Sequence, residues 1–102
     1  MILWLNGAFG AGKTQTAFEL QRRLPRAFVY DPENLGYWIR ACLPPALHRP
    51  DFQDHPQWRA GNFALLDELA SSWDGVILVP MTITNPQYYQ QLIVRLSERH
   101  TL

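Results

Sequence analysis

Features that would link this chain to an oxidising compartment, a membrane or nucleic acid are scarce. A single cysteine, Cys42, excludes a disulfide within the chain. Nine basic and nine acidic residues cancel and form no block of like charge, so the charge does not favour nucleic acid as a partner. The apolar run at residues 1–5 is too short for a signal peptide or a membrane span. We therefore expect a cytoplasmic protein that binds neither nucleic acid nor membrane.

Three short apolar runs alternate with stretches of helical spacing. The runs at 2–5, 27–30 and 76–80 are typical of strands buried on both faces of a parallel sheet. One helical stretch follows the first run, two follow the second and one follows the third. This order predicts an α/β fold with right-handed crossovers, in one domain over residues 1–102. Residues 44–57 hold four prolines and are predicted to form an irregular, mobile loop beside the substrate site.

Two of the predicted helices carry apolar stripes that we expect to face the core. In the second helix the stripe has the spacing i, i+3, i+4, i+7, i+8 and consists of Leu35, Trp38, Ile39, Cys42 and Leu43. In the last helix, which we expect to be capped around Asn85, the stripe consists of Tyr89, Leu92, Ile93 and Leu96.

The turn after the first strand carries the clearest chemical motif. Residues 7–14 match G-x-x-x-x-G-K-[ST], the P-loop pattern, and they stand between a buried strand and a helix, as the motif requires. Backbone amides of such a glycine-rich turn point at an anion, and the helix that follows adds its positive end. We therefore predict a phosphate site formed by Gly7, Ala8, Phe9, Gly10, Ala11, Gly12, Lys13 and Thr14. Lys13 would neutralise the β- and γ-phosphates, and the Thr14 hydroxyl would bind Mg²⁺.

Asp31 follows the second predicted strand and has two interpretations. Ligands of parallel sheets bind at the carboxyl ends of the strands, so Asp31 is expected to face the same crevice as the P-loop. Its carboxylate there could accept the proton of a hydroxyl group that is being phosphorylated. Asp before Pro-Glu is also a good helix cap, and the two roles remain open.

Three further residues are candidates for contact with the substrate. Glu33, Tyr37 and Arg40 share a helical face opposite the apolar stripe. An arginine near a phosphate site can hold an acceptor or stabilise transferred charge, although an exposed arginine is common on any helix.

The segments around these residues resemble the tunicamycin-resistance proteins and their P-loop kinase relatives. The resemblance rests on the run from Trp4 to Ala17, on Asp31-Pro32-Glu33 and on Val79-Pro80-Met81-Thr82, and it spans almost the whole chain. It implies a three-layer α/β/α fold of the P-loop NTPase type, with ATP and Mg²⁺ as cofactors. It further implies phosphoryl transfer to a small hydroxylated acceptor, such as a nucleoside-like antibiotic, with Asp31 as the base.

The family's strand order is 2-3-1-4-5, so the three strands predicted here would take the order 2-3-1 and leave the sheet incomplete. The strand before the P-loop would then lie at an edge, which invites pairing. A homodimer or a C-terminal half would complete the sheet. Two other functions remain open: a non-catalytic nucleotide-binding module, and a P-loop ATPase of another class. The third strand ends in Pro80-Met81-Thr82, without the aspartate that many such ATPases have there.

Overall fold

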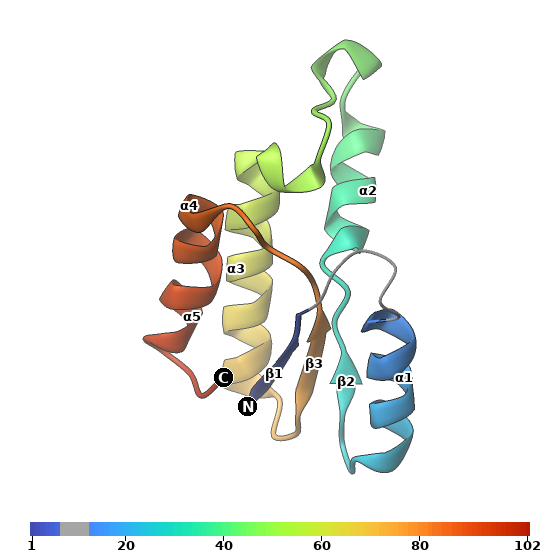
Figure 1. The fold of residues 1–102 in the computed structure, drawn as a ribbon, viewed down its shortest axis with the longest axis vertical. Helices are drawn as coiled ribbons and strands as arrows, with labels where there is room; N and C mark the ends of the chain where they lie inside the picture. The colour runs from blue at the N-terminus through green and yellow to red at the C-terminus, as the bar shows by residue number, and fades with distance from the viewer. Residues whose placement is uncertain (7–12) are drawn as a thin grey trace.

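The computed structural model describes residues 1–6 and 13–102, with only the backbone for Lys13 and Thr14. Three strands and four helical regions follow one another in the predicted order (Figure 1). The strands are β1 (Ile2–Leu5), β2 (Phe28–Val29) and β3 (Ile77–Pro80). The helices are α1 (Lys13–Arg23), α2 (Glu33–Cys42), α3 (Pro56–Ser72) and a final helix made of α4 (Pro86–Tyr89), a π-helical stretch (Gln90–Val94) and α5 (Arg95–Ser97).

The three strands form one parallel sheet in the order β1-β3-β2. This confirms the predicted order 2-3-1. All four residues of β3 are buried, as expected for the central strand. Among the described residues, β1 and β2 each pair with β3 alone. The structure is therefore a mixed α/β domain with a short parallel sheet.

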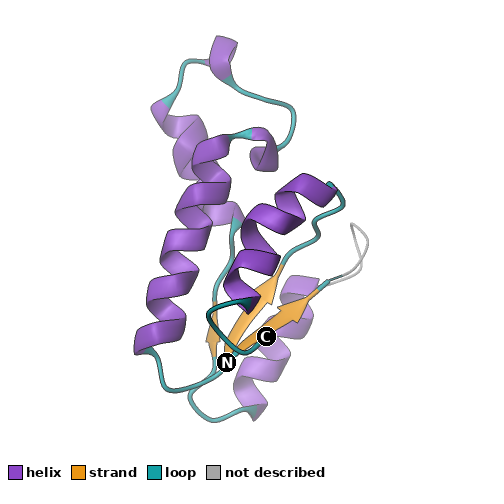
Figure 2. Cartoon of the chain, turned by 90° about the vertical axis from the view of Figure 1, so that its left-hand side faces the viewer, coloured by secondary structure: helices purple, strands orange, loops and turns teal. Residues whose placement is uncertain are grey.

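Helices pack on the sheet through side chains that alternate along β3. Ile77 and Val79 belong to a buried cluster with residues of α3 and of the final helix, among them Leu66, Leu92 and Leu96. Leu78 points to the opposite face, and α1, which contacts β2 and β3, buries Ala17 there. Figure 2 shows α3 and the final helix side by side, away from α1. No helix in the described part of the chain has the length and apolarity needed to cross a membrane.

Three predicted core positions are wrong. Trp38 is 65% exposed and Cys42 is also exposed, because α2 extends beyond the ends of the strands and only one side of it meets α3. Tyr89 is 42% exposed, whereas Tyr88 packs against the core. The Asn85 cap is confirmed, since its side chain accepts hydrogen bonds from the amides of Gln87 and Tyr88.

Candidate functional site

The carboxyl ends of β1 and β2 lie at the same edge of the sheet, with β3 between them. Leu5 pairs with Pro80, and Val29 pairs with Leu78. The Tyr30 amide continues the ladder by donating to the Leu78 carbonyl. Asp31 is thus about level with Leu5, two strand spacings away, which is roughly 10 Å. The sheet therefore brings Asp31 to the edge at which the chain enters the P-loop motif.

The motif itself falls largely outside the described residues. The predicted phosphate ligands at 7–12 are not described, nor are the side chains of Lys13 and Thr14. The flanking elements are described: β1 ends at Leu5, and α1 begins at Lys13. The first turn of α1 contains no acidic residue, so its positive end is not neutralised by its own side chains. An uncompensated positive end of a helix attracts anions.

Asp31 acts as a cap in this structure. Its Oδ1 atom accepts a hydrogen bond of 3.0 Å from the Glu33 amide, and its carbonyl accepts one of 3.2 Å from the Asn34 amide. These bonds satisfy amides at the start of α2 that have no partner within the helix. The capping interpretation is therefore confirmed, and the chemical role of the carboxylate stays a prediction.

A buried polar network connects the two chain neighbours of Asp31 to α3. The Tyr30 hydroxyl donates to Asn62 Oδ1 at 2.5 Å, and the Trp58 indole N–H donates to the Pro32 carbonyl at 3.0 Å. Asn62 Nδ2 lies 3.5 Å from the same carbonyl. Both Trp58 and Asn62 are buried on α3. Burial, and then the charge of Asp31, raise the pKa of Tyr30 well above its usual range, so its hydroxyl keeps its proton.

The structure separates the three candidate substrate residues on α2. Tyr37 and Arg40 come together on the Phe52 ring: the Tyr37 ring meets it edge-on, with centroids 5.0 Å apart, and the Arg40 guanidinium lies 4.2 Å from its centroid. Arg40 also donates to the Arg49 carbonyl at 3.2 Å. Glu33 is exposed at the start of the helix. Arg40 therefore holds the loop that follows α2.

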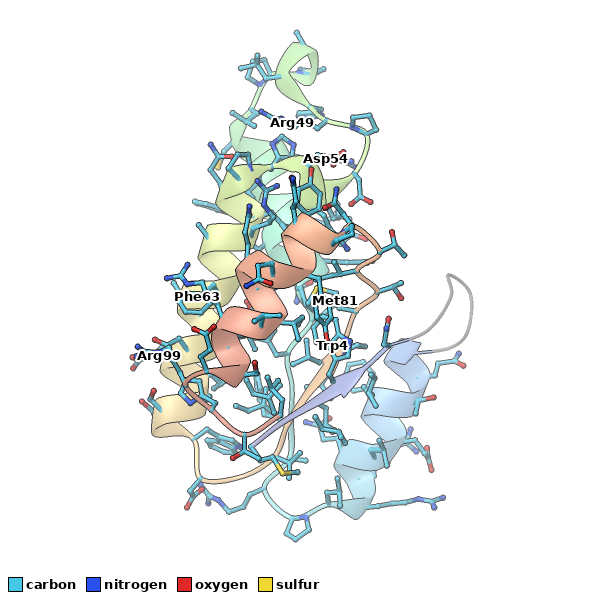
Figure 3. All side chains as sticks on the ribbon, turned by 60° about the vertical axis from the view of Figure 1, so that its left-hand side comes forward. Trp4, Arg49, Asp54, Phe63, Met81 and Arg99 are labelled. Carbon is cyan, nitrogen blue, oxygen red and sulfur yellow. The ribbon has the colours of Figure 1, made fainter. Side chains whose placement is uncertain are left out.

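The proline-rich segment 44–57 is less irregular than predicted. It contains two 3₁₀ turns, Pro45–Leu47 and Phe52–Asp54, and α3 already begins at Pro56. Side chains tie it to the end of β3 and to α4: Gln53 Nε2 donates to the Thr82 carbonyl at 2.6 Å, and the Tyr88 hydroxyl donates to Asp54 at 2.9 Å. Figure 3 labels Arg49 and Asp54 at this end of the molecule, where Arg49 donates to the Asp54 carbonyl.

His55 is buried where this segment enters α3. Its Nε2 atom accepts a hydrogen bond of 3.3 Å from the Arg49 amide. Burial is the main cause that lowers the pKa of His55, and the charges of Arg49 and Arg40 lower it further. The imidazole is thus held neutral, which suits its role as an acceptor. In the described part of the chain, no group of three or more acidic, histidine or cysteine side chains is placed to bind a metal ion.

The sequence prediction did not identify Tyr30, Trp58 and Asn62. A signal was present, because Trp58, Asn62 and Leu66 follow one another at intervals of four on one face of α3. An amide on an apolar helical face needs a partner inside the protein. That requirement would have pointed to a polar contact with the neighbouring strand end.

No protein-family model matches the chain, and no curated protein matches it in sequence. Among solved structures, the chain is similar to the tunicamycin resistance protein of Deinococcus radiodurans, with 33% sequence identity and a TM-score of 0.79. The match covers 96% of this chain and 56% of that protein. The chain thus spans little more than half the length of this relative.

Proposed function

Since this chain is related to the tunicamycin resistance proteins, as its sequence predicts, we propose that it functions in antibiotic resistance as a phosphotransferase. The donor is ATP with Mg²⁺, and the acceptor is a small hydroxylated molecule such as a tunicamycin-like nucleoside. The chain acts in the cytoplasm. Among the described residues no strand pairs with the outer side of β1, and in this proposal a second copy or a further C-terminal segment extends the sheet there.

One observation supports this proposal above the others: the parallel sheet brings Asp31 to the edge at which β1 ends and the sequence of the P-loop motif begins. β1 leads into the P-loop motif, and β2 leads into Asp31 at about the same level. Phosphoryl transfer needs a phosphate site and a group that orients the acceptor, and it depends mostly on their relative position. A module that only binds nucleotide would need Asp31 for the cap of α2 alone.

Each residue has a defined part in this proposal. The amides of residues 7–12 and the positive end of α1 bind the phosphates, and Lys13 neutralises their charge. Thr14 contributes its hydroxyl to the metal ion. Mg²⁺·ATP supplies the phosphoryl group when bound. Asp31 orients the acceptor hydroxyl and accepts its proton. Of the candidates on α2, Glu33 stands next to the Asp31 cap and contacts the acceptor in this proposal, whereas Tyr37 and Arg40 act further along the helix, where they pack on Phe52.

The test is transfer of label from γ-labelled ATP to a panel of nucleosides and tunicamycin, with the wild-type chain and Lys13→Ala. Loss of the lysine should reduce transfer by about 100-fold or more, because it removes a charge that stabilises the transferring group. Arg22→Ala is the matched control, since Arg22 lies exposed near the far end of the same helix. Equal transfer by Lys13→Ala and wild type would rule out the assignment.

Binding of Mg²⁺·ATP is measured separately by calorimetry. Binding without labelling of any acceptor would instead favour a nucleotide-binding module, and release of free phosphate would favour an ATPase.

A further inference from the structure

The turn that carries Asp31 is held from behind by two side chains of α3. Asp31 stands between Tyr30 and Pro32, and both of these neighbours are bonded to α3. The Tyr30 hydroxyl donates to Asn62, and the Pro32 carbonyl accepts from the Trp58 indole at 3.0 Å and more weakly from Asn62 at 3.5 Å. The aspartate is therefore tethered on both of its sides in the sequence.

Packing alone does not explain these polar groups. Asn62 is fully buried and Trp58 nearly so. An apolar side chain could fill the place of Asn62 without the free-energy cost of removing an amide from water. The role of the Asn62 amide lies in its hydrogen bonds. Both of its partners, the Tyr30 hydroxyl and the Pro32 carbonyl, belong to the segment 30–32.

The direction of the tethers matters for the carboxylate. Asp31 Oδ1 accepts from the Glu33 amide, so the side chain is oriented by the first turn of α2. The first turn of α2 is in turn located by the bond from Trp58 to the Pro32 carbonyl. A shift of this turn would move the carboxylate relative to the end of β1, although the hydrogen bonds described for Trp58 and Asn62 go to Tyr30 and Pro32 and not to the carboxylate itself.

We propose that Tyr30, Trp58 and Asn62 are positioning residues that hold the Asp31 carboxylate in place for the acceptor hydroxyl. This proposal rests on the proposed role of Asp31. It adds that the geometry of the site is set by α3, an element that the sequence motifs do not mark.

The first test needs no substrate. Hydrogen exchange of the Glu33 amide, followed by NMR, reports directly on its bond to Asp31. We expect Tyr30→Phe and Trp58→Phe each to raise the exchange rate of this amide at least fivefold, roughly the loss of one such bond. Trp73→Phe is the matched control, because it also removes an indole bond to a carbonyl, that of Arg26, at the opposite end of the sheet. Unchanged exchange at Glu33 in both variants would overturn the proposal.

The second test separates positioning from general loosening. In the labelled-ATP assay, Tyr30→Phe and Trp58→Phe should lower kcat about tenfold while the KM for ATP stays within a factor of two, because the phosphate site follows β1 rather than β2. Trp73→Phe should leave both constants unchanged. If Asp31→Asn lowers kcat but Tyr30→Phe and Trp58→Phe do not, the positioning role is wrong.

Failure of the proposed phosphotransferase function can be distinguished from failure of the positioning role. If Lys13→Ala and Asp31→Asn leave transfer unchanged, or if no acceptor is labelled, the phosphotransferase assignment falls. The Glu33 exchange measurement would still show whether the side chains of Tyr30 and Trp58 hold Asp31.

Discussion

At the scale of single residues, Asp31 combines a structural and a proposed chemical task. The structure shows its carboxylate accepting from the Glu33 amide, as a cap does. Its place at the carboxyl edge of the sheet is where a general base of a transferase would stand. The sequence could indicate both tasks but could not separate them, because Asp-Pro-Glu after a strand satisfies either one.

Two substitutions separate these tasks. Asp31→Asn keeps an oxygen that caps the helix, so the free energy of unfolding should change by only about 0.5 kcal/mol. The amide cannot accept a proton, so transfer should fall by about 100-fold or more. Asp31→Ala removes the cap as well and should lower the free energy of unfolding by about 1 kcal/mol. Urea denaturation and the labelled-ATP assay give both numbers for each variant. If Asp31→Asn transferred at the wild-type rate, the residue would be a cap only.

At the scale of secondary-structure elements, the sequence predicted the strands and helices well but not which helical faces are covered. The apolar runs at 2–5 and 76–80 match β1 and β3, whereas in the run at 27–30 only Phe28–Val29 form a strand and Phe28 is exposed. The apolar spacing in α2 does not reveal that the helix runs past the sheet and leaves Trp38 exposed. In the final helix the π-helical stretch Gln90–Val94 adds a residue to a turn. One turn before Leu92, the residue that faces the core is therefore Tyr88 and not the predicted Tyr89.

The contact between α2 and the segment after it could not be predicted from spacing either. Phe52 packs over Gly36, in the middle of α2, and a Cβ atom at residue 36 would lie 2.3 Å from the Phe52 ring. The glycine thus permits the close approach that lets Tyr37 and Arg40 flank the same ring.

Gly36→Ala should therefore destabilise the protein although alanine favours helices. Glycine to alanine inside a helix normally gains about 1 kcal/mol, but here the overpacking should lower the free energy of unfolding by about 1–2 kcal/mol. In a Phe52→Ala background the same change should become neutral or stabilising. Urea denaturation of the four proteins in this cycle measures the coupling.

The control for this cycle is Gly61→Ala on α3. A Cβ atom there meets only the end of the flexible Leu35 side chain, so this change should be tolerated. A stabilising Gly36→Ala in the presence of Phe52 would show that the ring moves aside easily.

At the scale of the whole molecule, the question is whether the outer side of β1 can pair with a further strand. Met1 and Leu5 accept from β3 through their carbonyls, so the even-numbered residues of β1 direct their backbone groups away from β3. The Ile2 amide on this outer side donates to the Thr101 carbonyl at 3.0 Å. The end of the chain thus already occupies the first position beside β1, where an added strand would begin.

The family resemblance predicted this edge correctly, because three strands in the order 2-3-1 place β1 outermost. It did not predict the contact that brings residue 101 there. Asp67 on α3 accepts from Arg99 Nε and His100 Nε2, each at 2.7 Å. These two bonds, first that of Arg99, lower the pKa of Asp67, so the carboxylate stays charged throughout the neutral range. A pairing between residues more than thirty positions apart leaves no local pattern in the sequence.

Asp67→Ala should release this segment from the edge of β1. Exchange of the Ile2 amide should rise about tenfold at pH 7, since its acceptor is no longer held in place, whereas Asp74→Ala, which breaks the surface pair with Arg26, should leave it unchanged. The sign of the pH dependence follows from the lowered pKa: the contribution of Asp67 is present above the ordinary aspartate pKa, near 4, and is lost as the pH falls through the lower folded value. Wild type and Asp67→Ala should therefore differ in free energy of unfolding at pH 7 and converge in strong acid. Slow Ile2 exchange that persists in Asp67→Ala would mean that pairing along β1 itself holds residue 101, and the edge would then be ready to accept a strand without help from α3.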